Sequence, residues 1–314
     1  MQIGIVGLGK MGFNFSLRLL EKGYQVSGFD SNPKPGEELA KQGGTATKSL
    51  EELAAKLSKP RIVLLSVPHD TIEEVLFGKN GLVNYLSTGD TVIDAANAFY
   101  KNSIHHYERL KQKGIGYLDM GVSGGPGGAR NGSSIMVGGD EVVYKKAEQV
   151  FKDLAAPEGY AYVGHSGAGH FTKMVHNGIE YGMMQAIAEG FTVLKNAPFQ
   201  LDLEKIAQVY NHGTVTESRL MGWLTQAFGE FGQNLSEVSG SVAQTGEGAW
   251  TAHTAKDLGI AVPIIEDSVK FRSDSAKNPS FTGQILTALR NQFGGHSIKP
   301  TSNLSSNRTN DGKK

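Results

Sequence analysis

The chain opens with Gln2–Gly12, QIGIVGLGKMG, in which a short apolar run leads directly into three glycines spaced G-x-G-x-x-G. The apolar run predicts a buried strand, and the following FNFSLRLLEKG has helical spacing. A strand, a glycine-rich turn and a helix in this order are typical of the dinucleotide-binding α/β fold. We expect Gly7 to allow the tight turn, Gly9 the approach of a pyrophosphate, and Gly12 close helix–strand packing. The predicted cofactor loop comprises Gly7, Leu8, Gly9, Lys10, Met11 and Gly12.

A second strand pattern, YQVSGFD, ends at Asp30, 18 residues after Gly12. An acidic residue about 20 residues beyond the glycines binds the adenosine ribose in this fold. A carboxylate accepts hydrogen bonds from the ribose hydroxyls and repels a 2′-phosphate, and neither Ser31 nor Asn32 is an arginine that could hold that phosphate. The sequence therefore predicts NAD rather than NADP, although an aspartate that only ends a strand would give the same pattern.

Apolar runs alternate with helical segments through the rest of the first half, with strands predicted at 61–68 (RIVLLSVP), 91–97 (TVIDAAN) and 114–125 (GIGYLDMGVSGG). This alternation predicts a parallel sheet covered by helices on both faces. The helical segment IHHYERLKQKG is expected to be exposed, with no role for His105 or His106.

Polar segments follow these strands, and ligands of such sheets bind at the carboxyl ends of strands. We expect Val67 and Pro68 along the nicotinamide side of the cofactor, and Asn97 within reach of cofactor and substrate.

The segment GVSGGPGGARNGSS holds six glycines in fourteen residues. A flexible linker has this composition. Because strand patterns flank the segment, we favour a loop whose backbone donors bind an anion. Ser123, Gly124 and Gly125 are the predicted donors to a substrate.

Composition excludes several classes of function. Lysine plus arginine and aspartate plus glutamate each total 31, so no net field attracts nucleic acid or an anionic membrane. The absence of cysteine excludes disulfides, thiolate zinc sites and cysteine nucleophiles. No H-E-x-x-H pattern occurs, so no metal is expected. No apolar run reaches the roughly 18 residues of a membrane span, and the opening residues lack a secretion signal. We expect a soluble, cytoplasmic protein with no nucleic-acid or membrane partner.

The pattern becomes helical from about residue 166. HSGAGHFTKMVHNGIEYGMMQAIAEGFTVLKN (165–196) predicts one long helix, and the segments that follow it also have helical spacing. We expect an α/β Rossmann-type parallel-sheet domain over 1–165, followed by an all-helical substrate and oligomerisation domain over 166–296. The polar segment 297–314 is expected to be a disordered tail.

The long helix carries polar residues at a suggestive spacing. Lys173 and Glu180 are seven residues apart, nearly two turns, and Asn177 lies one turn from the lysine. All three therefore share one face. A solvated polar stripe would look the same, so this spacing alone does not define a site.

Six segments together resemble the 6-phosphogluconate dehydrogenase family: GLGKMG, DAAN, VSGGPGGARNG, GAGHFTKMVHNGIEYGMMQ, TGEGAWTA and LRNQFGGH. They occur in the family's order along nearly the whole chain, and HNGIEYG is the most specific. The 3-hydroxyisobutyrate-type dehydrogenases resemble the first 165 residues almost as well, but lack the Ile-Glu-Tyr that follows here.

The resemblance implies an NAD-dependent enzyme that oxidises and decarboxylates 6-phospho-D-gluconate to D-ribulose 5-phosphate. It implies Lys173 as catalytic base, Glu180 as catalytic acid and Asn177 as their neighbour in catalysis. The implied substrate contacts are Asn97, Ser123, Gly124, Gly125, His176, Asn177, Glu180, Tyr181, Arg272, Arg290 and His296. Because the family supplies the last two from a neighbouring subunit, the resemblance also implies a homodimer or homotetramer.

The chain departs from the family pattern in places. Thr245 and Glu247 stand where long members have a lysine and a threonine, which leaves part of phosphate recognition open. NADP-using members have an Asn-Arg pair where this chain has Asp30, and long members have an apparently duplicated helical domain. These features indicate the short, NAD-preferring branch. A non-decarboxylating 3-hydroxy-acid dehydrogenase and a non-catalytic dinucleotide sensor remain alternatives, although a sensor does not need Lys173 or Glu180.

Overall fold

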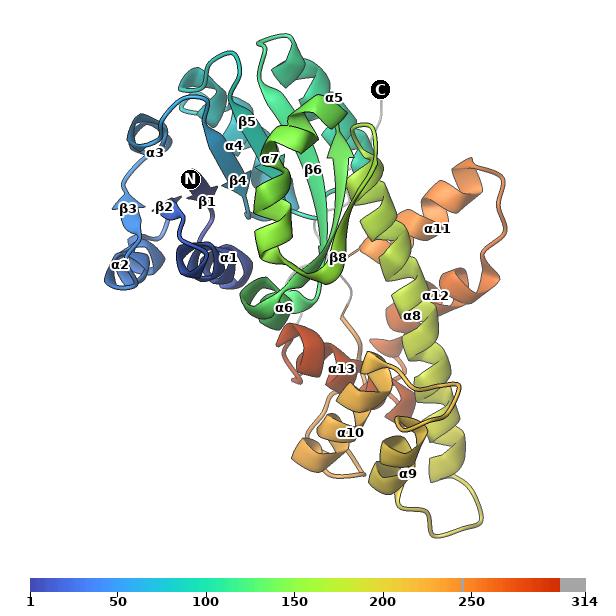
Figure 1. Ribbon diagram of the computed structural model, residues 1–314. Coiled ribbons are helices and arrows are strands. Elements are labelled where there is room, and N and C mark those ends of the chain that lie inside the picture. Colours follow the sequence, from blue (N-terminus) through green and yellow to red (C-terminus); the bar gives the residue numbers. More distant parts are fainter. Residues whose placement is uncertain (244–245, 300–314) are drawn as a thin grey trace. The chain divides into compact units, whose positions relative to one another are not determined.

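The computed structural model describes residues 1–243 and 246–299 (Figure 1). The chain divides into two compact units, one spanning Met1–His176 and the other beginning at Asn177. This division falls inside helix α8 (Ala168–Lys195), eleven residues after the boundary predicted at 165. Of the tail predicted at 297–314, residues 300–314 lie outside the described residues, as does Thr245.

The first unit is built on an eight-stranded sheet of order β3-β2-β1-β4-β5-β6-β7-β8. All neighbouring strands are parallel except β6 and β7, so the predicted parallel sheet is confirmed apart from this pair. The segment joining β6 to β7 is too short for the crossover that a parallel pair needs. The strands are β1 (Gln2–Val6), β2 (Gln25–Phe29), β3 (Thr45–Thr47), β4 (Ile62–Leu65), β5 (Thr91–Asp94), β6 (Gly116–Ser123), β7 (Ser133–Gly139) and β8 (Ala155–Gly164).

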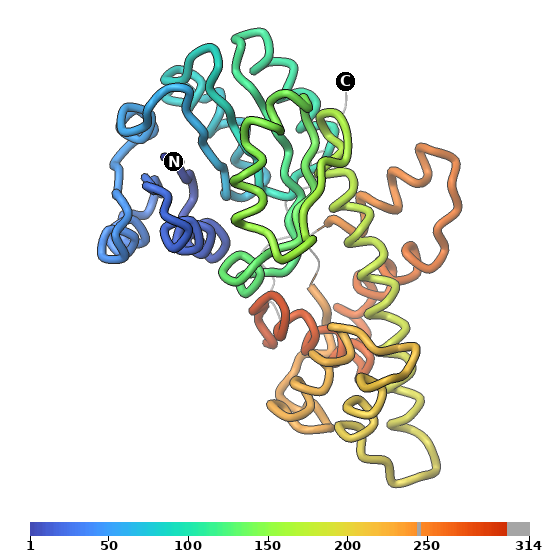
Figure 2. The backbone as a smooth tube through the Cα atoms, viewed as in Figure 1, coloured from blue at the N-terminus to red at the C-terminus, as the bar shows by residue number. Residues whose placement is uncertain are grey.

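Adjacent residues of a strand point to opposite sides of the sheet. Apolar clusters on both sides contain strand residues, so both faces of this sheet are buried. Leu64 of β4 belongs to one apolar cluster and Leu65 to the other. Phe15 and Phe151 cover the first face, from α1 and α7. The helices of this unit are α1 (Lys10–Glu21), α2 (Pro33–Lys41), α3 (Leu50–Lys56), α4 (Ile72–Phe77), α5 (Tyr100–Lys111), α6 (Gly125–Asn131) and α7 (Glu141–Leu154), with 3₁₀ turns η1 (His69–Thr71) and η2 (Leu82–Asn84). The backbone trace in Figure 2 shows the strand–helix alternation.

Two predictions for the first unit are corrected. The glycine-rich segment is not an open loop, because its centre forms α6, with Gly124 at φ +124° as the N-cap. The second concerns α5, where His106 is buried rather than exposed. The ring of His106 packs near Phe77 and Tyr117, while His105 is exposed as expected.

The second unit is helical, as predicted. Its apolar core gathers Phe191 of α8, Leu224 and Phe228 of α10, and Leu286 of α13. Three of its helices begin at a side chain that accepts a backbone N–H, namely Asp202, Ser218 and Ser280. After α8 come α9 (Leu203–Tyr210), α10 (Arg219–Phe231), α11 (Glu247–Asp257), α12 (Pro263–Ser275) and α13 (Phe281–Gly294). Within the described residues, no helix has the length and apolar character to cross a membrane.

Candidate active site

The glycine turn after β1 has the geometry that a pyrophosphate needs. Gly7 has φ +88°, and a Cβ there would lie 2.4 Å from the Ser66 carbonyl oxygen. A Cβ on Gly12 would lie 1.9 Å from the carbonyl oxygen of Gly7, so both positions require glycine for the fold. A Cβ on Gly9 would meet no protein atom within 4 Å, although Gly9 is the N-cap of α1. Packing therefore leaves the backbone open at the helix N-terminus, where anions bind.

Asp30 joins this turn to the end of β2. Its carboxylate accepts the N–H of Leu8 at 2.7 Å and the N–H of Asn32 at 2.8 Å. These bonds hold the carboxylate beside the glycine turn, as the ribose-binding acid of the fold requires.

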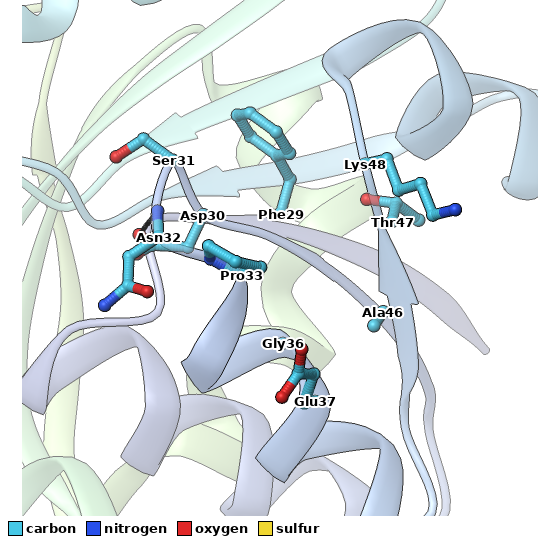
Figure 3. A pocket seen from close by; sticks show the side chains of 10 residues that line it. All are labelled: Phe29, Asp30, Ser31, Asn32, Pro33, Gly36, Glu37, Ala46, Thr47 and Lys48. Atoms are coloured by element: carbon cyan, nitrogen blue, oxygen red, sulfur yellow. Dashed lines mark hydrogen bonds between the residues drawn. The ribbon is translucent and has the colours of Figure 1, made fainter.

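Asp30 also lines a pocket of about 340 Å³ at the C-terminal ends of β2 and β3 (Figure 3). The lining holds the carboxylates of Asp30 and Glu37 and the ammonium of Lys48, with no arginine for a 2′-phosphate. The strand pattern had missed Thr47 and Lys48, because β3 is only three residues long. The pocket is lined by Phe29, Asp30, Ser31, Asn32, Pro33, Gly36, Glu37, Ala46, Thr47 and Lys48. The glycine turn and this acidic lining fit NAD.

The predicted residues after β4 and β5 lie at strand ends. Val67 and Pro68 connect β4 to the 3₁₀ turn at His69–Thr71. Asn97 has φ +51°, a conformation that asparagine tolerates better than most residues. Its side chain donates to the Val122 carbonyl at 3.0 Å and accepts the Val122 N–H at 2.8 Å. The amide keeps one further donor and one further acceptor site for a ligand.

Ser123 ends β6, and its hydroxyl lies 3.4 Å from Nε2 of His176 on α8. The next two residues, Gly124 and Gly125, both have positive φ and turn the chain into α6. The structure thus brings Ser123 and His176 together, with the two glycines adjacent in sequence.

Lys173 is held against the sheet by close packing. A Cβ on Gly121 of β6 would lie 2.5 Å from the Cβ of Lys173, so α8 approaches the strand at van der Waals distance. A Cβ on Gly169 would lie 2.3 Å from the Asp119 carbonyl oxygen. Larger side chains would push the helix away, and Lys173 is accordingly only 5% exposed.

Asp119 anchors the start of α8 and was missed by the sequence analysis. Its carboxylate is fully buried and accepts the N–H groups of Gly167 at 2.7 Å and His170 at 2.9 Å. A negative charge is favourable at a helix N-terminus. Ser103 adds a 2.7 Å hydrogen bond to Nδ1 of His170. The sequence did contain a signal for Asp119, because it is an aspartate within the otherwise apolar strand segment YLDMG.

Helix α8 runs unbroken through Lys173, Asn177 and Glu180. Lys173 and Asn177 are both buried, one turn apart, and Glu180 is half-buried. The polar residues of this helix face are therefore not the solvated stripe that their spacing alone allowed.

Two arginines are buried in the second unit. Arg272 of α12 is 2% exposed and Arg290 of α13 is 6% exposed. The guanidinium of Arg272 lies 3.3 Å from the centre of the Tyr181 ring, and its Nη2 lies 3.5 Å from the sulfur of Met184. Within the described residues, Nε of Arg272 has no hydrogen-bond partner.

Burial is the main cause of the altered pKa of both guanidinium groups. It lowers the pKa of Arg272 to about 10, with Tyr181 opposing this shift and the nearby charge of Arg290 adding to it. Burial likewise lowers the pKa of Arg290, against the opposing influence of Tyr181 and Glu180. The two guanidiniums and Tyr181 thus form one cluster in which like charges repel.

The start of α11 completes the surroundings of Tyr181. A Cβ on Gly248 would lie 2.5 Å from the Tyr181 ring, and one on Gly178 would lie 2.6 Å from Thr251. Glu247 is the first residue of α11. His296 follows α13, and its carbonyl accepts the side-chain amide of Asn291 at 2.8 Å.

No group of three or more histidine, aspartate or glutamate side chains suited to hold a metal ion occurs in the part of the chain that the structure describes.

The glycine turn, Asp30 and the sheet topology define a nicotinamide-dinucleotide-binding dehydrogenase. Two family models match the chain: the NAD binding domain of 6-phosphogluconate dehydrogenase at residues 2–167, and the 6-phosphogluconate dehydrogenase C-terminal domain at 169–280. The chain belongs to the 6-phosphogluconate dehydrogenase family. It is an oxidoreductase of CH–OH donors, and its cofactor is NAD.

Two relatives are similar over nearly their whole length. "Putative 6-phosphogluconate dehydrogenase YqeC" of Bacillus subtilis is 46% identical over 299 residues, 95% of this chain and 99% of the relative. The NAD(+)-dependent, decarboxylating 6-phosphogluconate dehydrogenase of Haloferax volcanii is 36% identical over 300 residues, 95% of this chain and 98% of the relative.

Solved structures agree with this family. The 6-phosphogluconate dehydrogenase of Plasmodium falciparum superposes with a TM-score of 0.79 at 30% identity, over 88% of this chain and 62% of that one. A 3-hydroxyisobutyrate dehydrogenase of Salmonella typhimurium gives 0.72 at 21% identity, over 92% of this chain and 99% of that one, and shares the fold.

Proposed function

We propose that the protein oxidises and decarboxylates 6-phospho-D-gluconate to D-ribulose 5-phosphate and CO₂ with reduction of NAD⁺. The observation that carries this proposal is the buried pair Arg272 and Arg290 beside Tyr181. Burial and the charge of Arg290 lower the pKa of Arg272 although Tyr181 and Glu180 oppose this shift, and guanidiniums bind phosphate oxygens in bidentate fashion. A phosphate supplies more compensating charge and more acceptor oxygens for two guanidiniums than the carboxylate of a small unphosphorylated acid does. The NAD(+)-dependent, decarboxylating activity of the Haloferax relative supports the same conclusion.

Lys173 is suited to accept the proton of the substrate's C3 hydroxyl, because its side chain is buried and burial favours the neutral amine. Bound NAD⁺ supplies the acceptor for the hydride. The resulting ketone lies β to the carboxylate, so CO₂ can leave as the electrons of the broken C–C bond pass toward the ketone oxygen. Protonated Lys173 donates to that oxygen, giving an enediol.

The enediol needs a proton on carbon, and Glu180 in its neutral form is the proposed donor. Seven residues of helix place its Cα about 10 Å from that of Lys173, a distance that two long side chains can narrow around a substrate. Asn177, between them on the same face, is proposed to bind the reacting hydroxyl or the lysine.

The remaining contacts divide by chemistry. Asn97, Ser123 and His176 offer hydroxyl, amide and imidazole groups to the carboxylate end of the substrate, together with the backbone at Gly124 and Gly125. Tyr181, Arg272, Arg290 and His296 are proposed to bind the phosphate.

Self-association is also proposed, on the evidence of exposed apolar side chains. Ile179 and Met183 of α8 are 56% and 45% exposed, and Ile264 of α12 is 67% exposed. Burying such residues between two copies is favourable. Light scattering during size-exclusion chromatography measures the oligomeric state.

We also propose a cytoplasmic location, because a chain without cysteine needs no oxidising compartment for disulfide formation.

The proposed activity is tested by following NADH formation by its absorbance, with 6-phosphogluconate, gluconate and 3-hydroxyisobutyrate as parallel substrates and with NAD or NADP. We expect turnover of the phosphorylated acid with NAD, release of CO₂ in equal amount to NADH, and little turnover of the other two acids. No NADH from 6-phosphogluconate, or faster turnover of 3-hydroxyisobutyrate, would contradict the proposal.

A further inference from the structure

The first unit has two helix N-termini beside the cofactor site, those of α1 and α2. Helix α1 begins after Gly9, and within the described residues no side chain caps its first turn. Helix α2 begins at Pro33, directly after Asn32, and both residues line the pocket that contains Asp30 (Figure 3). Unpaired N–H groups at a helix N-terminus bind anions. The two helix ends can therefore be compared as phosphate sites.

The first turn of α2 has few N–H groups to offer. Pro33 and Pro35 occupy its first and third positions, and proline has no backbone N–H. Between them, the N–H of Lys34 donates to the side chain of Asn32 at 3.2 Å. The N–H of Asn32 itself donates to the Asp30 carboxylate at 2.8 Å. From Asn32 to Pro35, every backbone N–H is therefore either absent or already engaged.

Pro35 also determines how α2 is capped. In α3, α10 and α13 the capping serine accepts the N–H of the residue three positions further on. In α2 that position is Pro35, and the Asn32 side chain accepts the N–H of Lys34 instead. Pro35 is not among the residues that line the pocket. Its effect is indirect, because it keeps the Lys34 N–H engaged in the cap.

Charge at the pocket gives a phosphate little compensation. The lining contains the carboxylates of Asp30 and Glu37 and the ammonium of Lys48. Lys48 is exposed, so solvent and salt screen its charge. A phosphate monoester carries about −1.5 to −2 charges near neutral pH. The lining is thus poorly suited to the 2′-phosphate that distinguishes NADP from NAD.

From these contacts we propose that the first turn of α2 is a determinant of cofactor choice that acts separately from Asp30. Asp30 opposes a 2′-phosphate by its charge. Pro33 and Pro35 oppose it by withholding the N–H groups that a helix N-terminus otherwise offers, a feature directed against the competing ligand. NAD has a 2′-hydroxyl and does not need these groups. The proposal concerns the cofactor alone and does not depend on which acid the protein oxidises.

A change of charge alone should then convert the cofactor preference only in part. In Asp30→Asn/Ser31→Arg the amide keeps one acceptor for the turn, and the guanidinium adds a phosphate ligand. Helix α2 still begins without available N–H groups in this variant. Adding Pro33→Ala and Pro35→Ala restores two of them, in a residue type that favours helix. The Asn32 side chain can then cap the restored N–H at position 35 and release that of Lys34.

The test measures the binding of NAD and NADP by calorimetry without a substrate. Four proteins are compared: the wild type, Pro33→Ala/Pro35→Ala, Asp30→Asn/Ser31→Arg, and the variant that combines all four substitutions. In the charge-changed background we expect the proline substitutions to strengthen NADP binding about tenfold, the usual contribution of a hydrogen bond to a charged group. NAD binding should stay nearly unchanged. Equal NADP affinity in the two charge-changed proteins would overturn the proposal.

Pro33→Ala/Pro35→Ala alone covers the case in which the charge-changed proteins do not fold, because neither proline is buried. With Asp30 intact, we expect the ratio of NADP to NAD affinity to rise severalfold, while both values still favour NAD. An unchanged ratio would contradict the proposal.

Pro263→Ala is the matched control, since Pro263 is the first residue of α12 in the second unit. This substitution restores an N–H at a helix start that does not line the pocket, and it should change neither affinity. Thermal melts of each variant measure the effect on the fold. If the proline substitutions in α2 weakened NAD and NADP binding equally, the turn would have a structural role only, and the proposal would be wrong.

Discussion

Buried charges are treated differently in the two units of the chain. In the first, Asp94 and Asp119 are both fully buried, and the protein itself supplies their donors. Asp94 accepts the hydroxyl of Tyr117 at 2.7 Å and the N–H of Ala96 at 3.0 Å, while Asp119 accepts two N–H groups at the start of α8. In the second, the Arg272 guanidinium lies against the Tyr181 ring and the Met184 sulfur, and burial lowers the pKa of both Arg272 and Arg290 against the opposing influence of Tyr181 and Glu180.

The difference separates buried charges whose hydrogen-bond donors the fold supplies from buried charges that are proposed to bind a ligand. A buried carboxylate whose hydrogen bonds are made contributes to stability, and removing its donors is costly. A pair of buried cations whose pKa is lowered by burial, with only partial compensation from neighbouring groups, contributes less to stability. In this chain, the polar groups of the first unit fix where α8 begins, and those of the second are proposed to bind an anion.

The largest expected effect is on Lys173, the buried amine of the first unit. We expect Lys173→Met to lower kcat by about 10²–10⁴-fold, the usual contribution of general acid–base catalysis. NAD affinity, measured by calorimetry, should stay close to that of the wild type because Gly7–Gly12 and Asp30 are unchanged. Activity within a few-fold of wild type would remove Lys173 as the base.

Substitution of Arg290 tests most directly whether a buried charge serves ligand binding or stability. We expect Arg290→Met to raise KM for 6-phosphogluconate by about 10–100-fold, since a hydrogen bond to a charged group contributes about 1.5–3 kcal/mol. Thermal stability should be unchanged or higher, because Arg272 loses a repelling neighbour.

Arg219→Met is the control for the arginine pair, because Arg219 is an exposed arginine over the ring of Trp223. It should alter neither KM nor stability. A loss of stability in Arg290→Met with unchanged KM would show that Arg290 has a structural role.

Substitution of Asp119 should have the opposite effect, lowering stability while leaving KM nearly unchanged. In Asp119→Asn an amide NH₂ replaces one acceptor and faces a backbone N–H, so we expect the free energy of unfolding to fall by about 1–3 kcal/mol. KM for the phosphorylated substrate should change little. Urea unfolding of this variant beside Asp94→Asn measures the loss, and an unchanged midpoint for both variants would contradict the idea that these carboxylates hold the first unit together.

Local patterns predicted much of this molecule. The strand–turn–helix at Gln2–Gly12 and the apolar runs near residues 61 and 91 were sufficient for the sheet, because buried parallel strands are continuous apolar runs. The helical second unit followed from spacing alone. The predicted roles of Lys173, Asn177 and Glu180 rested on a long, specific sequence match rather than on geometry.

The rest depended on contacts distant in sequence. The three-residue β3 was too short to show a period, and the antiparallel β7 could not be told from a parallel strand by its apolar pattern. The burial of His106 and the proximity of Arg290 to Arg272 are products of tertiary packing.

The smallest predicted effect concerns His106. It tests whether the first unit keeps the buried imidazole ring of this residue in its neutral form. Its ring is buried, its Nε2 lies 3.3 Å from Glu73, and Nδ1 has no hydrogen-bond partner among the described residues. Burial lowers the pKa of His106 below 6.5, against the opposing charges of Asp94 and Glu73 and together with the repulsion of His105. The folded state therefore favours the neutral ring.

Because the unfolded chain binds a proton at this histidine before the folded chain does, the free energy of unfolding should fall as the pH falls through about 6.5. The fall should end once the pH is below the lowered pKa of the folded state. His106→Gln removes this proton and should flatten the stability profile in that window, while His105→Gln, at an exposed neighbour, should leave it unchanged. Thermal melts of the three proteins from neutral to mildly acidic pH measure the difference. An identical slope in wild type and His106→Gln would mean that the fold accommodates the charged ring as readily as the neutral ring.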